Sequence, residues 1–308
     1  MTTSVTPESI LTAQGLPSSD DYEMPTSTRR FDDGGQFRLE VSGVERLSNL
    51  ETLLTESKRH DVFVHRIISF GGGATLLDQG ELRAFAQLAA ENGIEVVAVP
   101  GPRAGWDTGR HLTSREGATS GKRIRGIDNI RYLLHDLLRI YSVGIRGVLV
   151  IDEGVLDILA KARRRGDIPE DAFFKVSVYA GHANPASVRL LEGLGADSVN
   201  PVGDLSRPML SAIRGATSVP LDVWAITFDS FGGITRLWEA ADIARVAAPV
   251  YFKIEPGESE EVMYNGYTDP EFHDRLIRHK VRHAALLREL ATSVDPGVTV
   301  SPAPGDTR

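Results

Sequence analysis

The sequence feature that most constrains the fold is a regular alternation of two hydrophobic periods. Short runs rich in β-branched residues are followed by segments whose apolar residues recur three and four positions apart. These are the patterns of a strand and of an amphipathic helix. Eight units of this kind in about 260 residues predict a closed (β/α)8 barrel, the TIM barrel. The strand-like runs lie at 37–43, 62–69, 94–100, 147–153, 172–180, 196–202, 221–227 and 250–255.

An open, doubly wound α/β sheet is the other arrangement of alternating strands and helices. Such a sheet carries a glycine-rich turn directly after its first strand. The chain has Val41-Ser42-Gly43-Val44 at that place, without the glycine pattern. We therefore expect the barrel, and we place it at residues 36–294.

The segments outside the barrel differ from it in composition. Residues 1–35 are rich in Ser, Thr, Pro and Asp, and residues 295–308 contain Pro, Gly, Ser and Thr without a sustained period. Such segments bury too little apolar surface to offset the entropy of ordering. We expect a disordered or loosely docked tail at 1–35 and a disordered tail at 295–308.

Composition also restricts the classes of chemistry and of partner. The chain has 308 residues, a formal net charge of −8 and no cysteine. The absence of cysteine excludes disulfides, a cysteine nucleophile and thiolate metal ligands, so we expect no iron–sulfur cluster. The acidic balance argues against nucleic acid as a partner, and no apolar run reaches the roughly 18 residues of a membrane helix. With no secretory signal evident, we expect a cytoplasmic protein; the sequence does not specify its oligomeric state.

The alternation along each strand predicts which side chains face the barrel interior. The surrounding helices are apolar, so the apolar phase of a strand should face outward and the other phase inward. The strands at 62–69 and 94–100 cannot be phased in this way, although His65 and Arg66 compete for one inward position, and the strand at 147–153 is apolar in both phases until Asp152. The predicted inward residues of five other strands are polar: Arg38, Glu40, Ser42, Lys175, Ser177, Tyr179, Ser198, Asn200, Asp222, Trp224, Tyr251, Lys253 and Glu255.

The charged members of this set suggest two interpretations. Buried charges cost several kcal/mol each unless they are paired, which favours a structural network of ion pairs. TIM-barrel active sites lie at the C-terminal ends of the strands, so charges near that rim can instead serve catalysis. The candidate catalytic residues, chosen by their position along the strands, are Lys253, Glu255, Asp222, Tyr179 and Asp152.

A long basic segment follows the third strand. Residues 101–125 contain six Lys or Arg against Asp107 and Glu116, a net charge of +4. Loops this long are typically lids or binding loops, and the charge suits an anionic substrate such as a carboxylate or phosphate. A solvated loop is the alternative. Arg103, nearest the strand, and Trp106, which offers an apolar face, are the candidate binding residues.

Three other segments supply further candidate binding residues at the rim. Gly232 and Gly233 follow the seventh strand and are predicted to begin a helix whose N–H groups bind an anion, or else to form a simple turn. His182 follows the fifth strand and is a candidate base or ligand. Asn200 ends the sixth strand.

Four stretches, at 101–103, 145–154, 175–206 and 231–253, resemble the peptidase U32 (collagenase-like protease) family. The specific part is an order of motifs within 175–206: Lys-Val-Ser, Asn-Pro-Ala-Ser, Leu-Gly-Ala-Asp and Asp-Leu-Ser. The resemblance, to a short single-domain type, implies a (β/α)8 fold and a hydrolase acting on a peptide or amide. Members of the family are often rich in cysteine, whereas this chain has none, and no Ser-His-Asp or zinc signature is present.

Three functions therefore stay open. A hydrolase would use Glu255 or Asp222 to activate water. A lyase or isomerase acting on a small anionic metabolite would use Lys253 as a Schiff-base amine, or a divalent metal held by Asp152, Asp222 and Glu255 with His182. A non-catalytic barrel would bind a ligand or a partner protein. The sequence specifies no cofactor, and we expect Lys253 and Glu255 in the active site.

Overall fold

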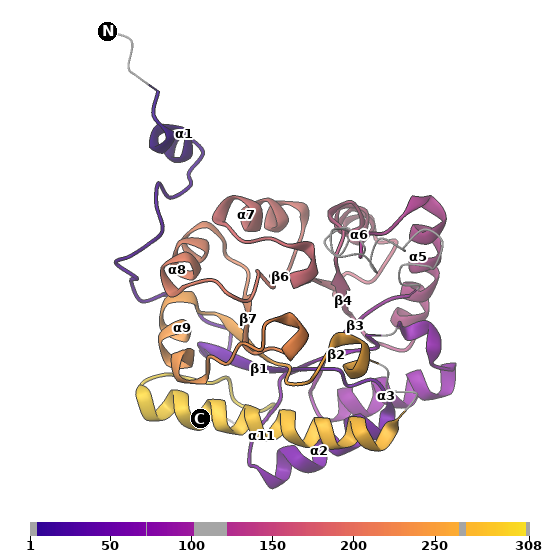
Figure 1. Cartoon of the computed structure of the whole chain (residues 1–308). Coiled ribbons are helices and arrows are strands. Elements are labelled where there is room, and N and C mark those ends of the chain that lie inside the picture. Colours follow the sequence, from indigo (N-terminus) through magenta and orange to yellow (C-terminus); the bar gives the residue numbers. More distant parts are fainter. Residues whose placement is uncertain (1–4, 72, 102–121, 265–268, 306–308) are drawn as a thin grey trace.

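The structure is a computed structural model that describes residues 5–71, 73–101, 122–264 and 269–305. It confirms the predicted fold. Eight parallel strands close into a barrel in the order of the sequence, and β1 completes the circle by pairing with β8. Figure 1 shows the helices arranged around the strands.

The strands are short and each ends before or at the predicted boundary. The fifth predicted run continues to residue 180, but the strand ends at Val176 because Ser177 accepts a hydrogen bond from the backbone N–H of Tyr179. That bond stabilises a 3-10 turn at Val178–Ala180, so Tyr179 lies on a turn rather than on a strand. The strands are β1 (Phe37–Ser42), β2 (Arg66–Ser69), β3 (Glu95–Ala98), β4 (Gly147–Val150), β5 (Phe173–Val176), β6 (Ser198–Val199), β7 (Leu221–Ile226) and β8 (Val250–Ile254).

Local capping sets the helix boundaries. Asn184 accepts from Ser187 N at 2.9 Å and precedes Pro185, while Gly195 adopts a left-handed conformation at the other end of the same helix. The helices are α1 (Pro7–Ala13), α2 (Leu47–Arg59), α3 (Gln79–Glu91), α5 (Gly126–Ser142), α6 (Glu153–Arg165), α7 (Pro185–Leu194), α8 (Arg207–Ala216), α9 (Ala240–Ala247), α10 (Glu260–Met263) and α11 (Pro270–Val294). None of the helices in the described ranges is both long and apolar enough to cross a bilayer.

The main core lies between the strands and the helices. Leu39 of β1 and Phe252 of β8 are buried in it, together with Leu50 of α2 and Phe85 of α3. These outward strand residues belong to the apolar phase, as the alternation predicts. The inward phase is consequently left to the polar residues.

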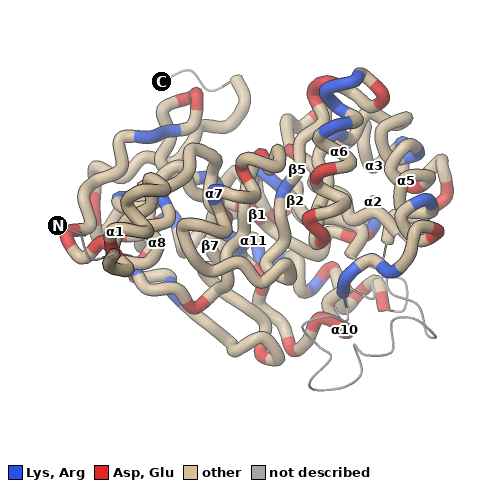
Figure 2. The backbone as a smooth tube through the Cα atoms, turned by 90° about the horizontal axis from the view of Figure 1, so that it is seen from above, with Lys and Arg blue, Asp and Glu red and all other residues tan. Residues whose placement is uncertain are grey.

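The interior of the barrel is divided into an apolar side and a polar side. Ile68 of β2 and Val97 of β3 form a separate apolar cluster there. Leu149 of β4, Phe173 of β5 and Val99, which directly follows β3, complete it. The polar residues come mainly from β1, β5, β6, β7 and β8. Figure 2 shows charged residues on the outer helices and also in the middle of the molecule, where the strands lie.

Both terminal segments make specific contacts in their described parts. Ser27 binds the backbone carbonyls of Arg245 and Ala248. The helix α1 projects outward in Figure 1, and Arg189 of α7 donates to the carbonyls of Gln14 and Gly15 directly after it. At the other terminus, Ser301 N donates to Phe37 O at 3.0 Å, and residues 299–301 run beside the start of β1. These contacts are largely made by the backbone, so the composition of the tails gives no sign of them.

Candidate active site

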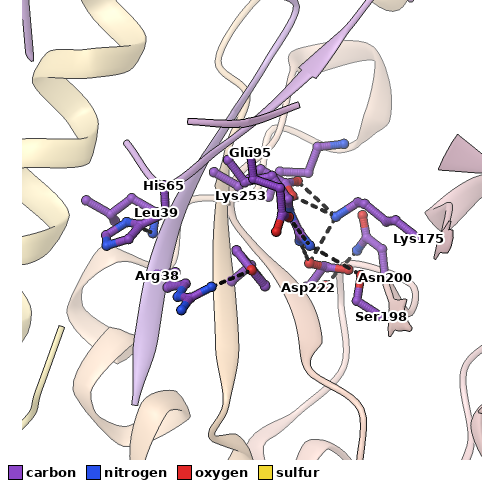
Figure 3. A network of polar contacts seen from close by, with 12 residues as sticks. Arg38, Leu39, His65, Glu95, Lys175, Ser198, Asn200, Asp222 and Lys253 are labelled. Atoms are coloured by element: carbon purple, nitrogen blue, oxygen red, sulfur yellow. Dashed lines mark hydrogen bonds and ion pairs between the residues drawn. The ribbon is translucent and has the colours of Figure 1, made fainter. Parts of the chain in front are cut away.

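Four buried charged side chains form a ring of ion pairs inside the barrel. Arg66 Nε donates to Glu40 Oε2 at 2.5 Å, and Arg66 Nη2 donates to Asp222 Oδ1. Lys175 Nζ lies 2.9 Å from both Glu40 oxygens and 3.0 Å from Asp222 Oδ1 (Figure 3). Each charge therefore faces two of opposite sign, the arrangement in which attraction offsets the cost of desolvation.

The ring keeps the Glu40 carboxylate ionised. Burial alone raises the pKa of Glu40, but Arg66 and Lys175 outweigh it and bring the pKa to about 2. Glu95, which lies 3.4 Å from Arg66 at the edge of the ring, differs from Glu40, because burial outweighs the nearby cations and raises its pKa above the usual value. This part of the interior is a structural framework whose charges are already used by one another.

Arg66, and not His65, takes the inward position on β2 for which the sequence offers both residues. His65 turns the other way: Leu39 N donates to its Nδ1 at 3.1 Å, and its Nε2 lies 2.9 Å from Ser301 O. Because Nδ1 accepts, Nε2 carries the proton. Burial lowers the pKa of His65 to about 4, which keeps the imidazole neutral. The pattern of the sequence does not decide between His65 and Arg66 and does not single out Glu95, because the apolar residues of β2 and β3 do not alternate strictly.

Lys253 and Glu255, the pair expected in the active site, meet at the C-terminal end of β8. Lys253 Nζ lies 3.0 Å from Glu255 Oε2, and the hydroxyl of Tyr264 donates to Glu255 Oε1. Glu255 is fully buried, whereas the Lys253 side chain is 8% exposed. The Lys253 ammonium also lies 4.8 Å from the centroid of the Trp224 ring. An amine and a carboxylate are thus held in contact next to an aromatic wall.

The chain that follows β8 folds over this pair. Met263 of α10 is fully buried and packs with Val178, Trp224 and Phe228. The Tyr264 ring lies so close to Gly71 that a Cβ there would be 2.4 Å from it. Only glycine at position 71 therefore leaves room for Tyr264 to reach Glu255.

Lys280 is a buried cation near this pair that sequence reasoning misses. It comes from α11, and its Nζ donates to the carbonyl of Ser42 at 2.6 Å. Burial lowers its pKa to about 8. Its spacing from Ile277, Ala284 and Leu287 places it on the buried face of α11, and that spacing is the signal that could have revealed it.

The remaining predicted catalytic residues occupy other surroundings. Asp152 is the N-cap of α6, where Oδ1 accepts from Gly154 N at 3.0 Å. Asp222 belongs to the ring. Tyr179 lies at the rim, where the ammonium of Lys122 is 3.5 Å from its ring centroid and also pairs with Glu260.

The predicted binding residues are also dispersed. Asn200 Nδ2 donates to Asp222 O at 2.7 Å, deep in the barrel. His182 Nε2 lies 2.7 Å from Glu153 Oε1 at the rim, and Glu153 also binds Arg123. Arg123 and His182 outweigh the effect of burial and lower the pKa of Glu153. Arg103 and Trp106 lie outside the described residues.

The prediction that Gly232 and Gly233 begin a helix is wrong. Gly232 ends the 3-10 turn at Asp229–Phe231, with φ +98, and its N–H donates to Asp229 O at 3.1 Å. The N–H of Gly233 donates to Phe228 O at 3.2 Å. The chain then returns beside β7, and α9 begins only at Ala240. Both N–H groups are used by the turn.

Within the described ranges, no group of three or more His, Asp or Glu residues is placed to hold a metal ion. A groove of about 900 Å³ lies between α2, α3 and residues 300–304. It is lined by Leu39 and His65, at the opposite end of the barrel from Lys253.

Active sites of barrels lie at the C-terminal ends of the strands, and we place the candidate active site at the Lys253–Glu255 pair for that reason.

No protein-family model and no curated protein matches the chain. Among solved structures, a U32 peptidase is 19% identical, with 75% of this chain and 97% of that chain covered and a TM-score of 0.42. The YdjI aldolase from Escherichia coli K12 is 14% identical, with 86% and 93% covered and a TM-score of 0.47. A putative fructose-1,6-biphosphate aldolase from Coccidioides immitis is 13% identical, with 85% and 93% covered and a TM-score of 0.49. Similarity at this level carries no argument about activity.

Proposed function

We propose that the protein is a lyase or isomerase that forms an imine between Lys253 and the carbonyl carbon of a small substrate. The observation that carries the proposal is the contact of 3.0 Å between Lys253 Nζ and Glu255 Oε2 at the C-terminal end of β8. An amine becomes a nucleophile when a neighbouring base accepts its proton. Glu255 is such a base, and its position at the strand end matches the usual place of barrel chemistry.

The two residues suffice for a balanced reaction. The Lys253 ammonium passes one proton to Glu255, and the free amine forms a bond to the carbonyl carbon. A proton moves from nitrogen to the former carbonyl oxygen, giving a carbinolamine. Glu255 then returns its proton to that hydroxyl, the C–O bond breaks, and water leaves. The product is an iminium on Lys253 beside a Glu255 carboxylate, and the iminium can draw electrons from the adjacent carbon.

The surrounding residues favour Lys253 over Lys175 as the nucleophile. Lys175 Nζ contacts both oxygens of Glu40 and also Asp222, so its protons are engaged inside the ring. Lys253 contacts one carboxylate oxygen, and the other oxygen of Glu255 is occupied by Tyr264. Tyr264 is thus a positioning residue that holds the carboxylate of Glu255 with Oε2 3.0 Å from the amine.

The test is borohydride trapping with pyruvate and with glyceraldehyde, read by intact mass and peptide mapping. We expect one adduct, on Lys253, that is absent in Lys253→Met and in Lys253→Arg; the arginine variant keeps the charge next to Glu255. Glu255→Gln should slow trapping about 100-fold or more. Lys161→Met removes an exposed lysine of α6 and is the matched control. Adducts spread over surface lysines, or retained in both Lys253 variants, would refute the proposal.

The sequence stretches that resemble U32 peptidases favour a second candidate, hydrolysis of a peptide or amide with Glu255 activating water. Ser177 and Ser198 supply no activated nucleophile, since their hydroxyls accept from Tyr179 N and from Arg66. Digestion of gelatin and of a mixed peptide library, read by mass spectrometry, tests this candidate. Cleavage that disappears in Glu255→Gln would establish hydrolysis and displace the imine proposal.

A further inference from the structure

We infer that the substrate is a hydroxyaldehyde or hydroxyketone, recognised by unpartnered polar atoms of Ser42, Asn200, Asp222 and Trp224 in the barrel interior. This inference rests on the proposed function, because it names the compound whose carbonyl group Lys253 would attack.

The four atoms belong to side chains that are almost completely buried. Ser42 and Asp222 are 0% exposed, and Asn200 and Trp224 are 1% exposed. Ser42 Oγ, Asn200 Oδ1, Asp222 Oδ2 and Trp224 Nε1 have no hydrogen-bond partner in the described structure. Buried polar atoms are nearly always satisfied, so four orphans in the inward phases of β1, β6 and β7 indicate a missing partner. The strands β6 and β7 pair with each other, and β8 lies between β7 and β1.

The neighbouring bonds determine which atom of each group is free. Asn200 Nδ2 donates to the carbonyls of Pro201 and Asp222, which fixes the amide with Oδ1 as the unpartnered atom. Arg66 and Lys175 both take Asp222 Oδ1, which leaves Oδ2. Figure 3 shows Asn200, Asp222 and Lys175 directed toward the same region.

The chemistry of these atoms selects the ligand group. Asn200 Oδ1 and Asp222 Oδ2 only accept, Trp224 Nε1 only donates, and the Ser42 hydroxyl does both. An alcohol satisfies all of them because it donates and accepts. A carboxylate or phosphate cannot donate to Asp222, and an ammonium cannot accept from Trp224. Trp224 also faces Lys253, so the hydroxyl groups would lie close to the reacting carbonyl.

The experiment compares two aldehydes of three carbons. Glyceraldehyde carries two hydroxyls and propanal carries none. We measure the rate of borohydride trapping on Lys253 and divide it by the rate with N-acetyl-lysine methyl ester, which corrects for intrinsic reactivity. We expect the corrected rate to favour glyceraldehyde at least ten-fold.

Two conservative variants probe the orphan atoms directly. Trp224→Phe removes the N–H and keeps an aromatic ring, and Ser42→Ala removes one hydroxyl. Each should reduce the preference for glyceraldehyde several-fold. Ser69→Ala is the matched control: Ser69 Oγ is also buried and unpartnered, but it lies on the outward phase of β2. It should leave the preference unchanged.

The outcomes separate this inference from the proposed function. Equal corrected rates, with the adduct on Lys253, would leave the imine reaction standing and overturn the inference, with water filling the orphan positions. If neither aldehyde is trapped, the imine proposal fails, and saturation-transfer NMR with erythritol decides the inference. A signal lost in Trp224→Phe and kept in Ser69→Ala supports it, and the absence of a signal overturns it.

Discussion

The guanidinium carbon of Arg66 lies 3.3 Å from the centroid of the Tyr251 ring. While its face covers that ring, its edges reach Glu40, Asp222 and Ser198. A planar group with five donors can stack and bind two carboxylates at once, which a lysine ammonium cannot do. One side chain of β2 thereby links four other strands across the interior.

We predict that Arg66→Met destabilises the fold by about 3–5 kcal/mol, because it leaves Glu40 and Asp222 with one cation between them. Arg66→Lys should recover only part of this loss. The measurement is urea unfolding followed by circular dichroism. Arg131→Met is the control, since Arg131 pairs with Asp128 at 3.0 Å on the exposed face of α5. That change should leave the free energy of unfolding almost unchanged, because solvent screens an exposed pair, and equal shifts in the two variants would contradict the prediction.

Stability should decrease on acidification in two stages. The folded-state pKa of His65 is lowered to about 4 from 6.5, so the unfolded chain binds more protons between these values. Its contribution is present above 6.5 and is lost as the pH falls toward 4. Glu40, lowered from 4.5 to about 2, adds a further loss below pH 4.5. Unfolding midpoints in urea at a series of pH values measure this. In His65→Gln the urea midpoint should fall less between pH 6.5 and 4 than in the native protein. A midpoint that does not change with pH in the native protein would disprove the assignment.

Gly71→Ala should impair catalysis more than stability. Its new methyl group would displace Tyr264, which holds Glu255 in place. We expect the trapping rate at Lys253 to fall to that of Tyr264→Phe, and the double variant to show no further loss. Gly193→Ala in α7 is the control, because a Cβ at that position would have no neighbouring atom within 4 Å. It should raise stability by about 0.5–1 kcal/mol without changing trapping. Independent, additive losses in the double variant would show that Gly71 acts elsewhere.

Asp152→Ala should cost about 1 kcal/mol in unfolding free energy, because it removes the N-cap of α6. Asp152→Ser keeps a capping oxygen and should restore most of that loss. Neither change should alter trapping at Lys253. A large loss of trapping in a variant that remains folded would instead establish the catalytic role that the strand position predicts.

The fold and half of the candidate site can be predicted from the sequence because both depend on local periods. Lys253 and Glu255 are two residues apart on one strand, so a period of two places both on the inward face. The sequence could not decide between Arg66 and His65 for the inward position of β2, since the apolar residues of that strand do not alternate. Tyr264 and Lys280 come from a connecting segment and from α11, and only the closure of the barrel brings them to β8 and β1.

Two local expectations show where composition fails. The glycines correctly predict a turn at Gly232. They do not show whether the N–H groups bond within the turn, as they do here, or stay available for a ligand at the start of a helix. The polar segment near Ser301 has little apolar surface, yet its backbone pairs with that of Phe37. Backbone pairing depends on the geometry of the partner strand, which no property of the segment itself reports.

The ring of charges also determines how the barrel can be divided. Glu40 and Arg66 belong to the half formed by β1 to β4, and Lys175 and Asp222 belong to the half formed by β5 to β8. The Lys175–Glu40 and Arg66–Asp222 contacts cross from one half to the other. Either half expressed alone would keep one ion pair, Glu40–Arg66 or Lys175–Asp222, but each of these charges would lose one of its two partners. The protein is therefore a poor donor for recombination of half-barrels, whereas circular permutation, which retains all eight strands, leaves every one of these charges matched.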